Sequence, residues 1–148
     1  MGSNYSNTSL NKNMRKNLYL VMIAVIITTM FLVAGIDKIL HFEKVVGGFK
    51  KRLPIELPDL LNRLAILIAI VIEIVAPLAL VYAAYNFENP ETRKYGVYSA
   101  LALVVFTVAA TLIYHFPPFG ATYYPFMSNL STVGGLLLMA WVFSKKDN

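Results

Sequence analysis

The chain has 148 residues, the length of one domain. Apolar residues make up 57% of it and charged residues 14%, whereas soluble domains have about 45–50% and about 25%. A soluble protein of this size could not bury that much apolar surface in one core, so lipid is the expected solvent. The net charge of +5 does not indicate nucleic acid, because the basic residues flank the apolar runs in small groups. The absence of cysteine excludes disulfides, thiolate catalysis and cysteine-bound metals.

The N-terminal part divides into a polar segment and a first apolar run. Residues 1–17 are rich in Ser and Asn and predict a flexible polar tail. Residues 18–36 contain no charge and are long enough to cross about 30 Å of hydrocarbon. The apolar core of a signal peptide has only about 7–15 residues. We therefore expect a retained membrane helix at 18–40.

The rest of the chain predicts three further membrane helices. Residues 37–63 form a polar connection that is interrupted by glycine and proline, and Asp59 is placed to cap the next helix. Apolar runs then predict helices at 60–85, 95–116 and 126–143, followed by a basic tail at 144–148. The predicted fold class is an all-α integral membrane protein, an antiparallel four-helix transmembrane bundle spanning 18–143.

The distribution of basic residues gives an expected orientation. Four spans place both termini and the turn at 86–94 on one side, which carries seven Lys and Arg residues against six on the other. If Lys38 and Arg63 point into the bundle, the second side keeps four. The positive-inside rule then predicts cytosolic termini.

Glu73 is the most informative polar residue, because it lies about halfway along the second apolar run. A charge inside hydrocarbon costs about 2.5–3.5 kcal/mol on insertion scales. The carboxyl group should therefore face the bundle and be either protonated or paired with a cation. Pro77 removes the hydrogen bond to the carbonyl of Glu73 and predicts a kink. The residue is either a structural partner that locks two helices together or part of a functional site.

Other polar residues gather on the side opposite the termini. Thr107, Thr111 and His115 are four residues apart, on one face of the third helix. We expect a polar pocket with Glu73 at its floor, formed by Lys38, Glu73, Thr111, His115 and Asn129. The alternative for Lys38 and for Arg63 is that their side chains extend to lipid headgroups. No metal motif, nucleotide loop or nucleophile elbow is present, and the two histidines, His41 and His115, are poorly spaced for a metal.

Several short segments together resemble the DoxX family of four-helix membrane proteins over residues 18–143. They are FLVAGIDKI (31–39), LPIELPDLL (53–61), Glu73, HFP (115–117) and NLSTVGG (129–135). The resemblance implies that Lys38, Glu73, His115 and Asn129 occupy the polar positions typical of the family. It also implies several roles, since some members are subunits of membrane oxidoreductases, including a quinone-linked complex that oxidises thiosulfate. Others belong to oxidative-stress assemblies, and distant relatives are cargo receptors. Lys50-Lys51-Arg52 and the long N-terminal tail depart from many members.

Two hypotheses follow. The first is an accessory or membrane-anchor subunit of a redox complex, without autonomous catalysis, which binds a quinone through Lys38, Glu73 and His115. The second is a non-enzymatic receptor, scaffold or small-solute transporter, in which the basic 37–63 connection docks a partner protein. Either form would contact the lipid bilayer, and a homo-oligomer is compatible with both.

Overall fold

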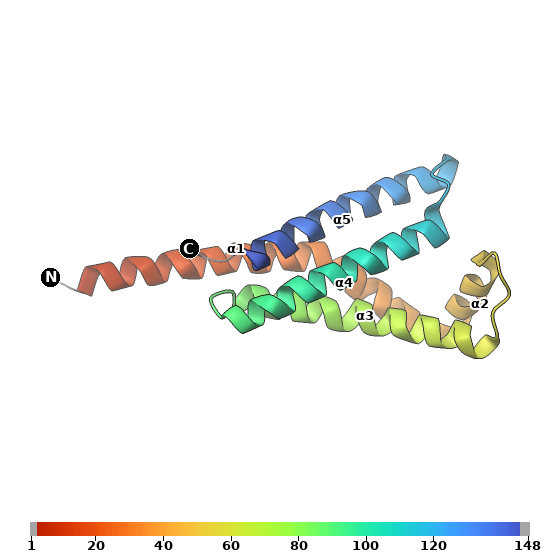
Figure 1. Ribbon diagram of the computed structural model, residues 1–148, viewed down its shortest axis with the longest axis horizontal. Coiled ribbons are helices and arrows are strands. Elements are labelled where there is room, and N and C mark those ends of the chain that lie inside the picture. The colour runs from red at the N-terminus through yellow and green to blue at the C-terminus, as the bar shows by residue number, and fades with distance from the viewer. Residues whose placement is uncertain (1–2, 146–148) are drawn as a thin grey trace.

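The computed structural model describes residues 3–145, with side chains described from residue 17 onward. Figure 1 shows α1 (Ser3–Leu40), α2 (Phe42–Arg52), α3 (Asp59–Tyr85), α4 (Pro90–His115) and α5 (Tyr123–Ser144), with a short 3₁₀ turn at Gly120–Thr122. Four segments are long and apolar enough to cross a membrane: Asn17–Leu40, Asp59–Tyr85, Pro90–His115 and Gly120–Ser144. The predicted all-α four-helix bundle is confirmed, and its helices fit a multi-pass membrane protein.

The predicted helix boundaries are close to the observed ones, with the largest differences at helix starts. α1 begins at Ser3, inside the segment expected to be a polar tail, although the side chains before Asn17 lie outside the described residues. Residues 146–148, which are most of the predicted basic tail at 144–148, lie outside them too. α4 begins at Pro90 rather than at 95, because the Asn89 side chain accepts a hydrogen bond from the backbone of Glu91 at 2.9 Å. Proline suits the first turn that this cap opens.

The 37–63 connection contains a helix that the sequence analysis did not predict. α2 carries apolar Val45, Val46 and Phe49 among basic residues, an amphipathic pattern. Its Gly47-Gly48 pair lies inside the helix and does not form a turn. The expectation that Asp59 caps α3 was wrong. Pro58 occupies the cap position, and Asp59 uses its carboxylate to bind Arg63 instead, with 2.7 Å between Oδ2 and Nε.

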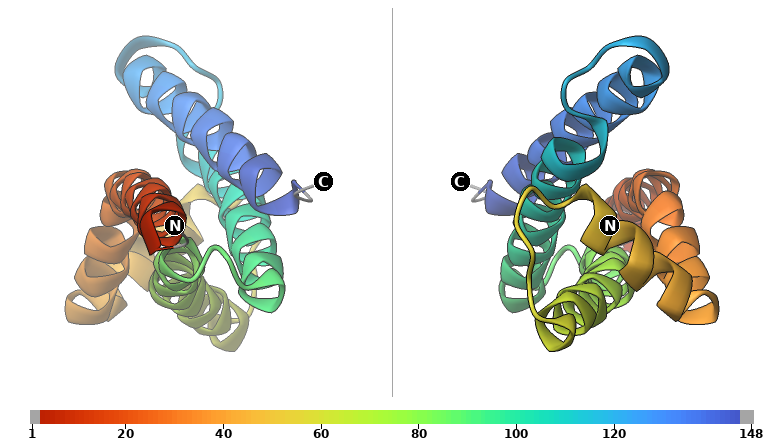
Figure 2. Two further views of the ribbon diagram at one scale, coloured as in Figure 1. Left: turned by 90° about the vertical axis from the view of Figure 1, so that its left-hand side faces the viewer. Right: turned by 90° about the vertical axis from the view of Figure 1, so that its right-hand side faces the viewer.

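The four long helices pack in a chain of antiparallel neighbours. α1 packs on α3, α3 on α4 and α4 on α5, whereas α1 and α5 are in contact over a short stretch only. Both termini lie at one end of the molecule, and the α1/α3 and α4/α5 pairs diverge toward the other end, where α2 stands between them (Figure 1). Figure 2 shows α2 crossing that open end.

The apolar core fills the half of the bundle near the termini. Leu80, Leu103 and Leu136 are fully buried there, from α3, α4 and α5. Phe143 packs so closely on α4 that a Cβ atom at Gly96 would lie 2.8 Å from its ring. The half that carries α2 buries apolar Val46 and Ile66 together with polar side chains, among them Asn62, Glu73, Thr107 and Thr111. The fold therefore leaves room for a site at the α2 end.

Candidate functional site

A buried ion pair joins α1 to α3. The Lys38 ammonium donates a hydrogen bond to Glu73, with 2.8 Å between Nζ and Oε1. The Glu73 side chain is 4% exposed and that of Lys38 is 22% exposed. Gly35 permits this contact, since a Cβ atom there would lie only 3.1 Å from the Glu73 Cβ. Of the two predicted alternatives for Glu73, protonation or pairing with a cation, the structure shows a cation partner, a lysine near the end of the preceding membrane helix.

The second carboxylate oxygen of Glu73 is buried without a partner. Oε2 has no hydrogen bond to any residue that the structure describes. An ionised carboxylate accepts several hydrogen bonds, and a buried acceptor that lacks a partner costs about 1–3 kcal/mol or more. The Lys38 contact therefore satisfies only part of the hydrogen-bonding capacity of this group.

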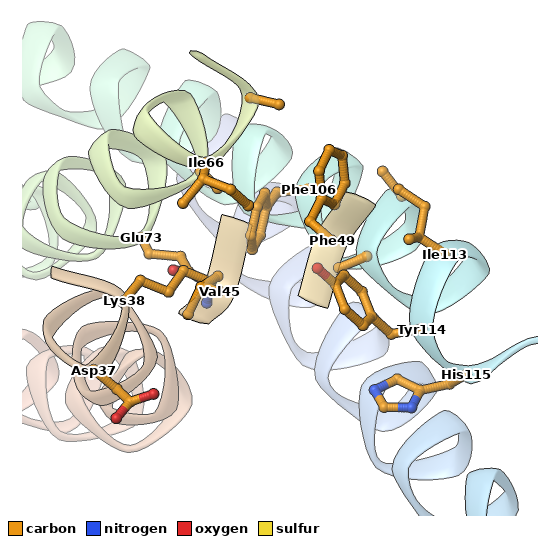
Figure 3. Close-up of a pocket in the computed structure, with 14 residues that line it drawn as sticks. Asp37, Lys38, Val45, Phe49, Ile66, Glu73, Phe106, Ile113, Tyr114 and His115 are labelled. Carbon is orange, nitrogen blue, oxygen red and sulfur yellow. The ribbon is translucent and has the colours of Figure 1, made fainter. Parts of the chain in front are cut away.

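The ion pair lies against a cavity of about 460 Å³, which we call the inner cavity. Its lining comes from α1, α2, α3 and α4, and is mostly aliphatic or aromatic. Figure 3 shows Lys38 and Glu73 together in one part of the lining and His115 in another, with Phe49 and Phe106 among the side chains between them. The volume falls in the range of about 300–1,000 Å³ that is usual for small-molecule sites.

The structure brings three of the five predicted pocket residues together and separates the other two. Lys38, Glu73 and His115 line the inner cavity. Asn129 donates a hydrogen bond to the hydroxyl of Thr111 at 2.9 Å, and this pair lines a separate cavity of about 160 Å³ between α4 and α5. The reason is helical geometry, because four residues advance an α-helix by about 40° beyond a full turn. This rotation brings His115 to the inner cavity while Thr111 still faces α5.

α2 covers the inner cavity, and side-chain contacts near its two ends hold it against α4 and α3. Its Val45 and Phe49 contribute to the cavity lining. At its end, Arg52 donates to the backbone carbonyl of Tyr114 at 3.0 Å, and the guanidinium lies 5.0 Å from the centre of the Tyr114 ring. Such a contact combines a hydrogen bond with a cation–π interaction.

The second contact that holds α2 in place involves Arg63 of α3. The alternative prediction for its side chain was that it extends to lipid headgroups. Its two terminal nitrogens bind the carboxylate oxygens of Glu43 at 2.7 and 2.8 Å. The bidentate geometry fixes the start of α2 against the start of α3. Arg52, Tyr114 and Glu43 were not predicted as site residues. The amphipathic pattern of α2 is the signal that could have found Glu43 and Arg52, whereas Tyr114 lies on α4.

Metal binding has no support in the described part of the chain, where no three His, Asp or Glu side chains gather closely enough to hold an ion. His41 instead pairs with Asp37, with 3.0 Å between Nδ1 and Oδ1. The inner cavity thus offers a single ion pair, apolar walls and one histidine for recognition of a ligand.

The chain matches no family model, no curated protein and no solved structure. Its function is therefore inferred from the inner cavity and the ion pair.

Proposed function

We propose that this multi-pass membrane protein is a DoxX-like accessory or anchor subunit of a redox complex, and that it holds a quinone in the inner cavity. One observation carries the proposal. Glu73 is buried at a mainly apolar cavity, with one oxygen bound to Lys38 and the other without a partner among the described residues.

The chemistry of the lining fits a compact lipophilic ring with hydrogen-bonding substituents. Aromatic Phe49, Phe106 and Tyr114 offer apolar faces to a flat molecule. The Lys38 ammonium has three N–H groups, of which one points to Glu73, so it can also donate to a carbonyl. The Glu73 carboxylate lines the cavity and has hydrogen-bonding capacity beyond the Lys38 contact, so it can accept from a hydroxyl. A quinone presents carbonyls and its reduced form presents hydroxyls, so both forms meet a matching group.

This chain and a partner protein would have distinct tasks in the redox complex. A bound quinone would supply two-electron redox chemistry, and this chain would bind it, orient its ring and shield it from water. The catalytic centre would belong to a partner protein. The exposed basic residues Lys44, Lys50 and Lys51 of α2 make no hydrogen bond or ion pair with the described part of the chain, and they are the proposed docking surface.

The resemblance to DoxX supports the same site. Three of the four polar positions that it marks, Lys38, Glu73 and His115, line one cavity. Cytosolic termini remain part of the proposal. Lys38 binds Glu73 inside the bundle, whereas Arg63 is exposed in its pair with Glu43 and still counts, so the α2 side keeps five of its six basic residues against seven on the side of the termini. Since the chain has no cysteine, single cysteines at Glu88 and Lys51 can test this orientation. An impermeant thiol reagent added outside intact cells should label only the second.

The experiment that tests the function is gentle purification from the native membrane, followed by mass spectrometry of proteins and extracted lipophilic molecules. The wild type should carry a quinone and an oxidoreductase. Glu73→Gln should lose the quinone, while Asn129→Ala, which alters the separate cavity, should keep it. A wild-type protein that carries lipid only, or a quinone indifferent to Glu73, would contradict the proposal. It would favour the alternative of a receptor, scaffold or transporter that uses the basic surface of α2.

A further inference from the structure

The inner cavity is elongated along the bundle axis. On α3 its lining includes Ala65, Ala69 and Glu73, which follow one another at four-residue spacing and so lie on one face of the helix. At a rise of about 1.5 Å per residue, this stretch covers about 12 Å. On α4 the lining extends from Phe106 to His115, a stretch of similar length. Both walls of the cavity therefore extend over about two turns of helix.

The ion pair lies at the deeper end of this elongated space. Glu73 is about halfway along α3, whereas Ala65 is two turns closer to the end of the bundle that α2 crosses. Figure 3 shows Lys38 and Glu73 at one end of the labelled lining and His115 at the other. The hydrogen-bonding groups of the ion pair and the apolar part of the cavity thus follow one another along the bundle axis.

Beyond the ion pair, the helices pack directly on one another. Pro77 comes one turn after Glu73 and is buried, and Leu80 and Leu103 are fully buried in the apolar core. These three residues are not part of the inner lining. For a ligand whose polar head contacts Glu73, the described core leaves no space deeper in the bundle. The remaining space of the cavity lies in the direction of Ala65.

Alanines make room for the apolar part of the cavity. Four of them line it from α3 and α4: Ala65, Ala69, Ala109 and Ala110. Each keeps part of its surface exposed, although the helices around it pack closely elsewhere. A longer side chain at one of these positions would take up cavity volume. Because Ala69 is one turn from Glu73 and Ala65 is two turns away, the two positions border different parts of a ligand bound at the ion pair.

We propose that the ligand is a chain-bearing amphiphile, bound with its hydrogen-bonding ring beside Glu73 and Ala69 and with its apolar chain along Ala65. This inference rests on the proposed function, and it assigns two specificity-determining residues to the quinone site. Ala69 leaves room for the ring next to the ion pair. Ala65 leaves room for the chain one turn closer to α2.

Two probes that share one ring can separate the two roles. Decylubiquinone carries a decyl chain, and dimethoxy-methyl-benzoquinone has a hydrogen atom in its place. The protein has no cysteine, so the free ring position of the second probe meets no thiol. Dissociation constants are measured by isothermal titration calorimetry at one detergent concentration. Each probe is compared only with itself across the variants, because the two probes partition differently into micelles.

The substitutions should act selectively on the two probes. Ala65→Leu should raise the dissociation constant of decylubiquinone at least about tenfold, the lower end of the cost of one methylene too many in a hydrophobic pocket. It should leave the constant of the chain-free ring unchanged, which also shows that the variant is folded. Ala69→Leu should weaken both probes, because the new side chain takes up space for the ring. Ala102→Leu is the matched control and should change neither constant, since Ala102 is exposed on α4 outside the inner lining.

The outcomes distinguish the position of the chain from the existence of the site. Unchanged binding of decylubiquinone by Ala65→Leu would overturn the inference, as would equal weakening of both probes by Ala65→Leu and by the smaller change Ala65→Val. In both cases, weaker binding by Glu73→Gln than by the wild type would leave the quinone site intact. A wild type that binds neither probe, or Glu73→Gln with wild-type constants for both, would overturn the proposed function and this inference with it.

Discussion

The Lys38 ammonium lies 2.8 Å from the Glu73 carboxylate, across the interface of two antiparallel membrane helices. This contact allows a carboxyl group to sit near the middle of α3, where an uncompensated charge would oppose membrane insertion. Glu73 lines the inner cavity, and its buried Oε2 has no hydrogen-bond partner among the described residues. One ion pair thus serves helix association and marks the candidate binding site.

The energetic coupling of this pair can be measured with a double-mutant cycle. Lys38→Met and Glu73→Gln should each lower the free energy of unfolding, because each leaves the other partner without its main contact. Each loss should be smaller than the value of about 3–5 kcal/mol that is found when one partner of a fully buried pair is removed, because Lys38 is 22% exposed. The double variant should lose less than the sum of the two single losses. Denaturation by SDS in mixed micelles measures all four proteins, and additive losses would show that the two groups are not coupled.

Glycines on α4 and α5 should differ in their tolerance of a methyl group. A Cβ atom at Gly96 would lie 2.8 Å from the buried ring of Phe143, whereas one at Gly134 would meet nothing within 4 Å. Gly96→Ala should therefore lower the free energy of unfolding by about 1–3 kcal/mol. Gly134→Ala should be neutral or stabilising, because alanine favours a helix over glycine by up to about 1 kcal/mol. Equal effects would contradict the close packing of α4 against α5.

Loss of the Glu43 carboxylate charge should increase local opening of α2 without unfolding the bundle. Glu43→Gln weakens the bidentate contact with Arg63, an exposed ion pair that contributes little to global stability. Hydrogen exchange of the α2 amides should become faster, while exchange in α3 and α4 stays unchanged. Glu56→Gln is the matched control, because Glu56 is exposed and forms no ion pair among the described residues. Slow exchange in α2 of the Glu43 variant would show that this contact does not hold the helix.

Asn129 should affect stability and leave the inner cavity intact. Its hydrogen bond to Thr111 joins α5 to α4 beside a separate cavity. Asn129→Ala should lower the free energy of unfolding by about 0.6 kcal/mol, the average for polar contacts between membrane helices. Binding of a quinone probe should be unchanged. A large loss of binding would place Asn129 in the same functional site as Glu73.

The membrane helices could be predicted from the sequence, as could a cation partner for Glu73 as one of two alternatives, because both follow from the cost of polar groups in lipid. Glu73 requires a partner at its own depth, and Lys38 stands at the end of the preceding apolar run. The apolar runs reveal length, but they do not distinguish a helix face that meets lipid from one that meets another helix, because both are apolar. The separation of α1 from α5 therefore could not be predicted.

Two features of the site were not predicted, because the local sequence pattern at each is compatible with more than one structure. A Gly47-Gly48 pair usually indicates a turn. Here the packing of Val46 and the side-chain contacts of Glu43 and Arg52 stabilise a helix that includes both glycines. Thr111 and His115 share a face in an idealised pattern, yet the small rotation between them places one toward α5 and the other toward the inner cavity. A sequence pattern can thus identify polar residues of one end of the bundle without assigning each to a cavity.

Equilibrium binding of decylubiquinone to purified wild-type protein, Glu73→Gln and Asn129→Ala measures directly whether Glu73 and the inner cavity bind a quinone. We expect saturable binding by the wild type and by Asn129→Ala. For Glu73→Gln we expect a dissociation constant at least about tenfold higher, a loss of about 1.4 kcal/mol in binding free energy. Equal affinities of the wild type and Glu73→Gln, or no saturable binding by the wild type, would contradict the claim that Glu73 and the inner cavity form a quinone site.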